Sequence, residues 1–72
     1  MKKTLAEAKK GETIKIVECL DLTTKYLIMR FGLTIGETVH CLTKVGPIII
    51  EKNKQTIAIG KNLANKIYIQ AA

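Results

Sequence analysis

Short runs of alternating apolar and polar residues, separated by glycine-containing turns, most constrain the fold of this 72-residue chain. In ETIKIVECL, Ile14 and Ile16 alternate with Thr13 and Lys15, a period of two that is typical of a strand with one buried face. Val17 interrupts the alternation and indicates a bulge or burial on both sides. A chain this short buries one face of several short strands most easily by curling the sheet into a barrel.

Four further segments have strand character. ETVHCLTKV places Val39 and Cys41 on one face, and Gly46 then marks a turn. PIIIEK, QTIAI and KIYIQ complete the set, with a hairpin turn at Asn53 and Lys54 between the first two. The strand residues expected to face a common core are Ile14, Ile16, Val39, Cys41, Ile49, Ile57, Ile59, Ile67 and Ile69.

Three segments are predicted to be helical. TLAEAKKGE predicts a short turn of helix at 5–8 that is closed by Gly11, and KNLAN predicts one turn with Leu63 and Ala64 facing inward. DLTTKYLIMRFG predicts the longest helix, with Gly32 as its C-terminal stop.

The complete pattern predicts a mainly β chain over 1–72 that forms a single domain. The expected fold is a small five-stranded barrel with one α-helix between strands 1 and 2 and a one-turn helix before the last strand. The longest helix carries Leu22, Tyr26, Met29 and Leu33 at helical spacing. We expect Met29 and Leu33 to be taken up by the core.

The charge balance favours a negatively charged partner or a solvated lysine-rich surface. The net charge is +6, with 12 lysines and arginines against 6 acids, and Arg30 is the single arginine. Sequence-specific nucleic-acid binding is disfavoured, because arginine is the residue that reads guanine edges by a bidentate contact. Anionic lipid headgroups at the inner leaflet require only charge. The lysines that could form a basic face are Lys2, Lys3, Lys9, Lys10, Lys52 and Lys54.

No catalytic or metal-binding constellation is recognisable. His40 and Cys41 are neighbours on a predicted strand, so their side chains point to opposite faces and do not grip one ion easily, even with Cys19 as a third ligand. The acids stand singly among lysines, which disfavours paired-carboxylate chemistry. We therefore expect no enzyme, no cofactor and no resident metal. MKKTLA lacks the apolar stretch of a secretory signal, and no span is predicted, so a cytoplasmic protein with cysteine thiols is expected.

The order and spacing of several segments resemble the ferrous iron transport protein A family (FeoA), whose members are small SH3-like domains. LAEAKKGE resembles the opening element of the family, and FGLTIGETV resembles its Leu-Gly-Leu/Ile-x-Pro-Gly-x-x-Val signature. GPIII, TIAI and the ending KIYI are similar to three further segments, so the likeness covers nearly the whole chain. The chain departs from the family at Ile35, where proline is usual, and at Tyr26 and Leu27, where arginines are common.

The resemblance implies a non-enzymatic cytosolic adaptor of ferrous iron uptake. Its partner would be the cytosolic part of a FeoB-type permease, which carries a GTPase domain, and the chain would act as a monomer or weak homo-oligomer. The alternative is a small basic barrel that binds RNA or single-stranded DNA, and direct ferrous iron binding is a weaker third option. The residues expected to contact the partner are Tyr26, Arg30, Ile35, Lys52 and Lys54.

Overall fold

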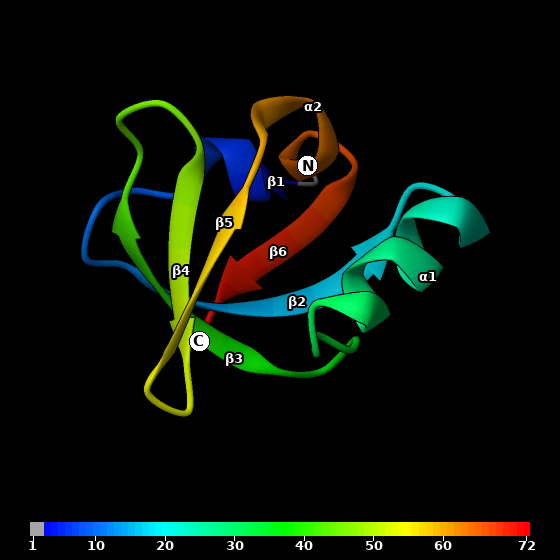
Figure 1. Cartoon of the computed structure of the whole chain (residues 1–72), viewed down its shortest axis with the longest axis horizontal. Coiled ribbons are helices and arrows are strands. Elements are labelled where there is room, and N and C mark those ends of the chain that lie inside the picture. Colours follow the sequence, from blue (N-terminus) through cyan, green and yellow to red (C-terminus); the bar gives the residue numbers. More distant parts are fainter. Residues whose placement is uncertain (1–2) are drawn as a thin grey trace.

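The structure of the chain, a computed structural model, describes residues 3–72. A curved sheet of six antiparallel strands, in the order β1-β6-β2-β3-β4-β5, makes up most of this part (Figure 1). In chain order, the elements are β1 (Lys3–Thr4), the 3-10 helix η1 (Leu5–Glu7), β2 (Thr13–Cys19), α1 (Leu22–Arg30), β3 (Thr38–Thr43), β4 (Ile48–Lys52), β5 (Gln55–Ile59), α2 (Lys61–Ala64) and β6 (Ile67–Ala71).

The five predicted strands are β2 to β6, and the positions of α1 and α2 in the chain order are confirmed. The sixth strand, β1, was not predicted because its two residues show no alternation; it pairs with β6 through Lys3 opposite Ile69. Figure 1 shows α1 at one end of the molecule, apart from the place where η1 and α2 pack against each other. The inner side of the curved sheet holds the core.

Most of the predicted core residues are buried. The core comprises Leu5, Ala8, Ile14, Ile16, Ile28, Leu33, Val39, Cys41, Ile48, Ile50, Ile59, Ala64, Ile67 and Ile69. The prediction for Ile49 was wrong, because Ile49 is half-buried while Ile48 and Ile50 fill the interior. Three consecutive isoleucines contain no polar residue to mark the outer face, so only the pairing of Ile50 with Cys41 settles it. Ile57 packs against the core from the edge strand β5 and stays partly exposed.

Two backbone features expected from the sequence are present. The register between β2 and β6 shifts between Ile16 and Glu18, which places the expected bulge at Val17. Asn53 and Lys54 form the β4–β5 hairpin turn with φ of 51° and 67°. Positive φ at both central residues is the signature of a type I′ turn, which matches the twist of the two strands that it joins.

Specific hydrogen bonds end α1 on both sides. The Asp21 side chain accepts a hydrogen bond from the Thr24 N–H at 2.8 Å and caps the N-terminus. At the other end, Gly32 has φ of +84°, and the Leu33 N–H donates to the Ile28 carbonyl at 3.0 Å. This is a Schellman arrangement, and its two apolar partners, Ile28 and Leu33, are both fully buried.

The side of α1 that faces the core differs from the prediction. Thr24 and Ile28 are its buried residues, and Leu33 follows them into the core as expected. Met29, which was also expected in the core, is about half exposed, so that prediction was wrong. The Schellman turn places Leu33 beside Ile28 and so fixes the rotation of the helix, which turns the side of Tyr26 and Met29 away from the sheet.

Candidate docking surface

The outward side of α1 carries a continuous apolar row. Leu22, Tyr26 and Met29 are 65%, 59% and 49% exposed. They are spaced i, i+4 and i+7, and at about 100° per residue this spacing puts them on one side of a helix. We call these three residues the outer stripe. Amphipathic helices use the same spacing to present anchors to a partner's groove.

Further apolar side chains are exposed between or next to the residues of the outer stripe in the chain: Leu20, Leu27, Phe31 and Ile35. The core residues are almost completely buried, so this concentration of exposed apolar residues within 16 positions exists beside a separate, well-buried core. Concentrations of exposed apolar surface on small domains mark interaction sites more often than single exposed residues do. The region is therefore the best candidate docking surface among the described residues.

The turn after α1 holds Ile35 on a rigid frame. The Glu37 carboxylate accepts hydrogen bonds from the Thr34 N–H and hydroxyl, both at 2.7 Å. The Gly36 N–H donates to the Ile16 carbonyl at 2.7 Å, which ties the turn to β2. Ile35 is 43% exposed at the centre of this arrangement. An apolar side chain on a turn with so many hydrogen bonds loses little backbone entropy when it binds.

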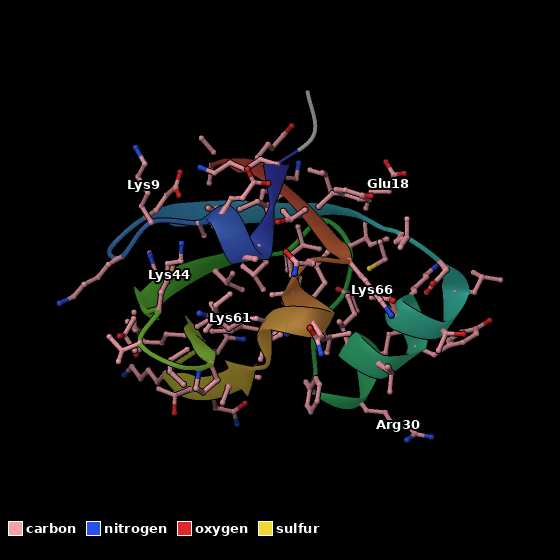
Figure 2. The ribbon with its side chains drawn as sticks, turned by 90° about the horizontal axis from the view of Figure 1, so that it is seen from above. Lys9, Glu18, Arg30, Lys44, Lys61 and Lys66 are labelled. Carbon is pink, nitrogen blue, oxygen red and sulfur yellow. The ribbon has the colours of Figure 1, made fainter. Side chains whose placement is uncertain are left out.

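Lys52 is part of the same frame. Its ammonium group donates to the Gly32 carbonyl at the end of α1 and forms an ion pair with Glu37 at 2.5 Å. Its side chain is accordingly only 23% exposed, although it was predicted to contact the partner. Arg30, in the last turn of α1, and Lys54, at the hairpin tip, are exposed, and in Figure 2 the Arg30 side chain points away from the fold. Partner contact by any of them stays a prediction.

The carboxylates at the two ends of this region have pKa values that favour their charged form. Burial would raise the pKa of Glu37, but hydrogen bonds from Lys52 and Thr34 outweigh it and lower that pKa. The Thr24 backbone N–H, with a smaller contribution from its side chain, lowers the pKa of Asp21. Both groups are therefore anionic near neutral pH and keep α1 and the following turn in place.

His40 and Cys41 lie on opposite sides of β3, as predicted. His40 is exposed, with its Nδ1 atom 2.7 Å from the Thr13 hydroxyl, whereas Cys41 is fully buried. Burial raises the pKa values of the Cys41 and Cys19 thiols, which disfavours the reactive thiolate form. Within residues 3–72, no three histidine, cysteine or acidic side chains are grouped closely enough to hold a metal ion, and no pocket is present.

The curved antiparallel sheet, the helix after β2 and the short helix before the last strand define a small SH3-like domain. The family model of the FeoA domain matches residues 3–71, and the chain belongs to the FeoA family. Membership supports a role in ferrous iron uptake, and the family is generally non-enzymatic.

Solved structures agree with this assignment. The chain is 32% identical to a crystal structure of an iron uptake regulatory protein (FeoA), with a TM-score of 0.89 over 100% of this chain and 99% of that one. A FeoA-like protein from Clostridium acetobutylicum shares 18% identity, with a TM-score of 0.85 over 97% of this chain and 86% of that chain. ScaR with bound Cd2+ shares 24% identity and a TM-score of 0.81 over 93% of this chain and 34% of its own. The last two likenesses concern the fold alone.

No curated protein sequence matches the chain. Between residues 3 and 72, neither helix has the length and apolar composition that crossing a membrane requires.

Proposed function

We propose that the chain is a non-enzymatic cytosolic accessory protein of ferrous iron uptake that docks on the cytosolic part of a FeoB-type GTPase permease and modulates it. The observation that carries the proposal is the outer stripe, which the fold turns toward solvent although its spacing is that of a buried helix face. Family membership supports a role in ferrous iron uptake, and the outer stripe is the surface that would contact the partner.

The geometry favours a partner that presents an apolar groove with an acidic rim. The outer stripe supplies three anchors, Leu22, Tyr26 and Met29, and tyrosine in particular is common at the centre of interfaces. Arg30 and Lys25 are exposed on the same helix, and their charges favour carboxylates at the edge of the groove. A second copy of the chain fits less well, because helix-to-helix pairing would bring these cations near their own counterparts.

Modulation then follows from differential affinity. A docked protein shifts its partner's conformational equilibrium only by the difference in its affinity for the two conformations. The rigid frame around Ile35 suits this role, because a surface that does not deform distinguishes between two partner conformations more sharply than a flexible one. In this proposal the chain acts as a monomer or weak homo-oligomer, and iron is the cargo of the permease.

Titration of the permease's isolated cytosolic region against the chain tests the proposal. Tyr26→Asp and Ile35→Asp should each weaken binding by about 1–2 kcal/mol, the size of a modest hot spot, while thermal melting stays close to that of the parent. Val45→Asp is the matched control, because Val45 is an exposed apolar residue on the loop between β3 and β4, remote from α1 (Figure 1).

Two outcomes contradict the proposed surface. If Ile35→Asp melts far below the parent, the residue contributes to the core and the proposed docking site at this turn is wrong. If both variants melt normally and bind as well as Val45→Asp, the partner uses another face, and the β4–β5 hairpin around Lys52 and Lys54 is the next surface to vary.

A further inference from the structure

A second exposed apolar site lies at the end of the molecule opposite α1. The loop between β3 and β4 presents Val45, which at 89% exposure is the most exposed of the large apolar residues. Leu42 and Pro47, on either side of it, are also exposed. Figure 1 shows this loop at the upper left of the molecule and α1 at its right. Val45 therefore lies outside the docking surface described above and calls for another explanation.

Lysines from two parts of the chain lie at this end of the molecule (Figure 2). Lys44, which is half-buried, precedes Val45 directly, and the segment that follows Lys9 and Lys10 is hydrogen-bonded to β3 at Cys41. That contact is made by the Gly11 N–H, which donates to the Cys41 carbonyl at 2.7 Å. In Figure 2, Lys9 and Lys44 lie at the same end of the molecule, away from Arg30.

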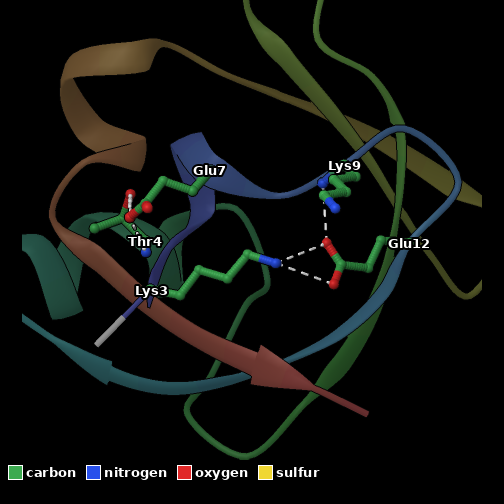
Figure 3. A network of polar contacts seen from close by, with 5 residues as sticks. All are labelled: Lys3, Thr4, Glu7, Lys9 and Glu12. Atoms are coloured by element: carbon green, nitrogen blue, oxygen red, sulfur yellow. Dashed lines mark hydrogen bonds and ion pairs between the residues drawn. The ribbon is translucent and has the colours of Figure 1, made fainter. Parts of the chain in front are cut away.

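The acids near these lysines are already engaged. The Glu12 carboxylate accepts hydrogen bonds from the Lys3 ammonium at 3.1 Å and from the Lys9 backbone N–H at 2.9 Å (Figure 3). The Glu7 carboxylate accepts hydrogen bonds from the Thr4 N–H at 2.9 Å and from its hydroxyl. Thr4 does most to lower the pKa of Glu7, and the charges of Lys3 and Lys44 add to this.

The lysines that were predicted to form one basic face therefore have different surroundings. Lys2 lies outside the described residues, Lys3 is bonded to Glu12, and Lys52 is bonded within the turn after α1. Among residues 3–72, the side chains of Lys9 and Lys10 form no ion pair, and both are exposed. Lys44 adjoins Val45 in the chain, and Lys9 and Lys10 lie on the segment that is hydrogen-bonded to β3; we call these three lysines together with Val45 the basic loop end.

We propose that the basic loop end binds an anionic membrane surface, with Val45 inserted among the headgroups and the three lysines over anionic lipids. An apolar tip at the same end of the molecule as several lysines suits a membrane interface, where the apolar side chain leaves water while each ammonium stays at the charged surface. Lysine needs no bidentate geometry to bind a headgroup phosphate. The three aromatic residues lie elsewhere, Tyr26 and Phe31 at α1 and Tyr68 on β6, so stacking platforms for nucleic acid are missing here.

This inference is independent of the proposed docking by α1, since the two surfaces are at opposite ends. If both are correct, the membrane contact leaves the outer stripe free to reach a membrane-embedded partner from its cytosolic side. The contact would concentrate the chain near the surface without any membrane-spanning element.

The test uses the full chain and lipid vesicles, either of phosphatidylcholine alone or with a minor fraction of phosphatidylglycerol. We expect binding to the anionic vesicles only. The triple variant Lys9→Gln, Lys10→Gln, Lys44→Gln should lower the partition coefficient on the order of a hundredfold, because each lysine near an anionic surface contributes about a fivefold factor. The matched control removes the same charge elsewhere, through Lys25→Gln, Lys54→Gln and Lys66→Gln, and should lower it less than about tenfold.

Insertion of the Val45 side chain into the membrane is measured separately, by tryptophan fluorescence. The chain has no tryptophan, so Val45→Trp introduces a single reporter, and Leu22→Trp on the outer stripe is its matched control. We expect a blue shift of Val45→Trp emission on anionic vesicles and no shift for Leu22→Trp. A blue shift of both in plain buffer would instead report misfolding, which thermal melting of each variant detects.

Several results overturn the inference. Equal losses in the two triple variants would mean that only net charge acts. A blue shift confined to Leu22→Trp would place the membrane contact on α1. If a generic oligonucleotide binds at moderate salt and competes with the vesicles through the same three lysines, the basic loop end is a nucleic-acid surface.

Discussion

On the inner side of the sheet, Ile48 and Ile50 are fully buried, whereas on α1 the outer stripe of Leu22, Tyr26 and Met29 is about half exposed or more. Both sets are apolar and both follow the period of their own secondary structure. The strand period leads to a core because neighbouring strands close over it. The helix period does not, because the buried residues of α1 are Thr24 and Ile28, which lie outside the outer stripe. The same kind of pattern thus builds the core in one region and a surface in the other.

Replacing one residue from each region by alanine gives the strongest test of this difference. Ile50→Ala should lower the free energy of unfolding by about 2–5 kcal/mol, because it removes buried methyl groups and leaves a cavity between β3 and β5. Met29→Ala should change it by less than about 0.5 kcal/mol, since the side chain is about half exposed and lies outside the core. Chemical denaturation measures both. Similar losses of unfolding free energy in the two variants would mean that the outer side of α1 is packed against the rest of the fold.

Ile49→Ala extends the same test to the outer face of β4. Ile49 is half-buried on the outer face of the sheet, so its loss should fall between those of the other two variants. A loss as large as that of Ile50→Ala would mean that the strand presents the opposite face to the core.

The turn at Gly32, where α1 ends, is expected to give the next largest effect on stability. Gly32 ends α1 with φ of +84°, and a Cβ atom placed there would meet nothing within 4 Å. Gly32→Ala should therefore cost on the order of 1 kcal/mol from backbone strain alone. Gly60→Ala is the matched control, because the space around Gly60 is equally open and its φ is −62°. Thermal melting should show a loss at Gly32 and none at Gly60. Equal melting temperatures would indicate that α1 ends without the Schellman turn.

Acid should loosen the turn after α1 by a smaller amount. The pKa of Glu37 is lowered from 4.5 in the folded chain, so its carboxylate stabilises the fold above about pH 4.5 and this contribution is lost as the pH falls through the lowered value. Glu37→Gln should lose less than about 1 kcal/mol near pH 7, as is usual for a partly exposed ion pair. Its stability should also fall less on acidification than that of the parent.

The control for this measurement is Glu51→Gln, which removes the same charge from β4, where no ion pair is formed among the described residues. Its stability at neutral pH should match the parent. If the two variants have the same pH dependence, the Lys52–Glu37 pair does not hold the turn.

Local patterns predicted the strands, the helix order and the tight turns. Alternation in ETIKIVECL and ETVHCLTKV follows from the geometry of a strand, in which successive side chains point to opposite faces. Gly32 as the end of α1 and Asn53–Lys54 as a hairpin turn follow from backbone preferences of single residues. The signature FGLTIGETV also carried the family resemblance, and the family match over residues 3–71 bears it out.

Contacts between distant residues decided the rest. Which isoleucine of β4 is buried depends on the register of β4 with β3, and the rotation of α1 depends on where Leu33 enters the core. The role of Lys52 could not be read from its neighbours in the chain, because its partners, Gly32 and Glu37, lie 20 and 15 positions away.

Local geometry and a spacing of turns that few folds share were enough to predict five of the six strands and the SH3-like fold class, whereas the two-residue strand β1 left no pattern in the sequence. The outward direction of the outer stripe and the engagement of Lys52 with Gly32 and Glu37 depended on tertiary contacts instead. The reason is physical: a side chain's direction relative to its own backbone is a local property, whereas what it meets there is set by strand pairing and packing across the whole chain.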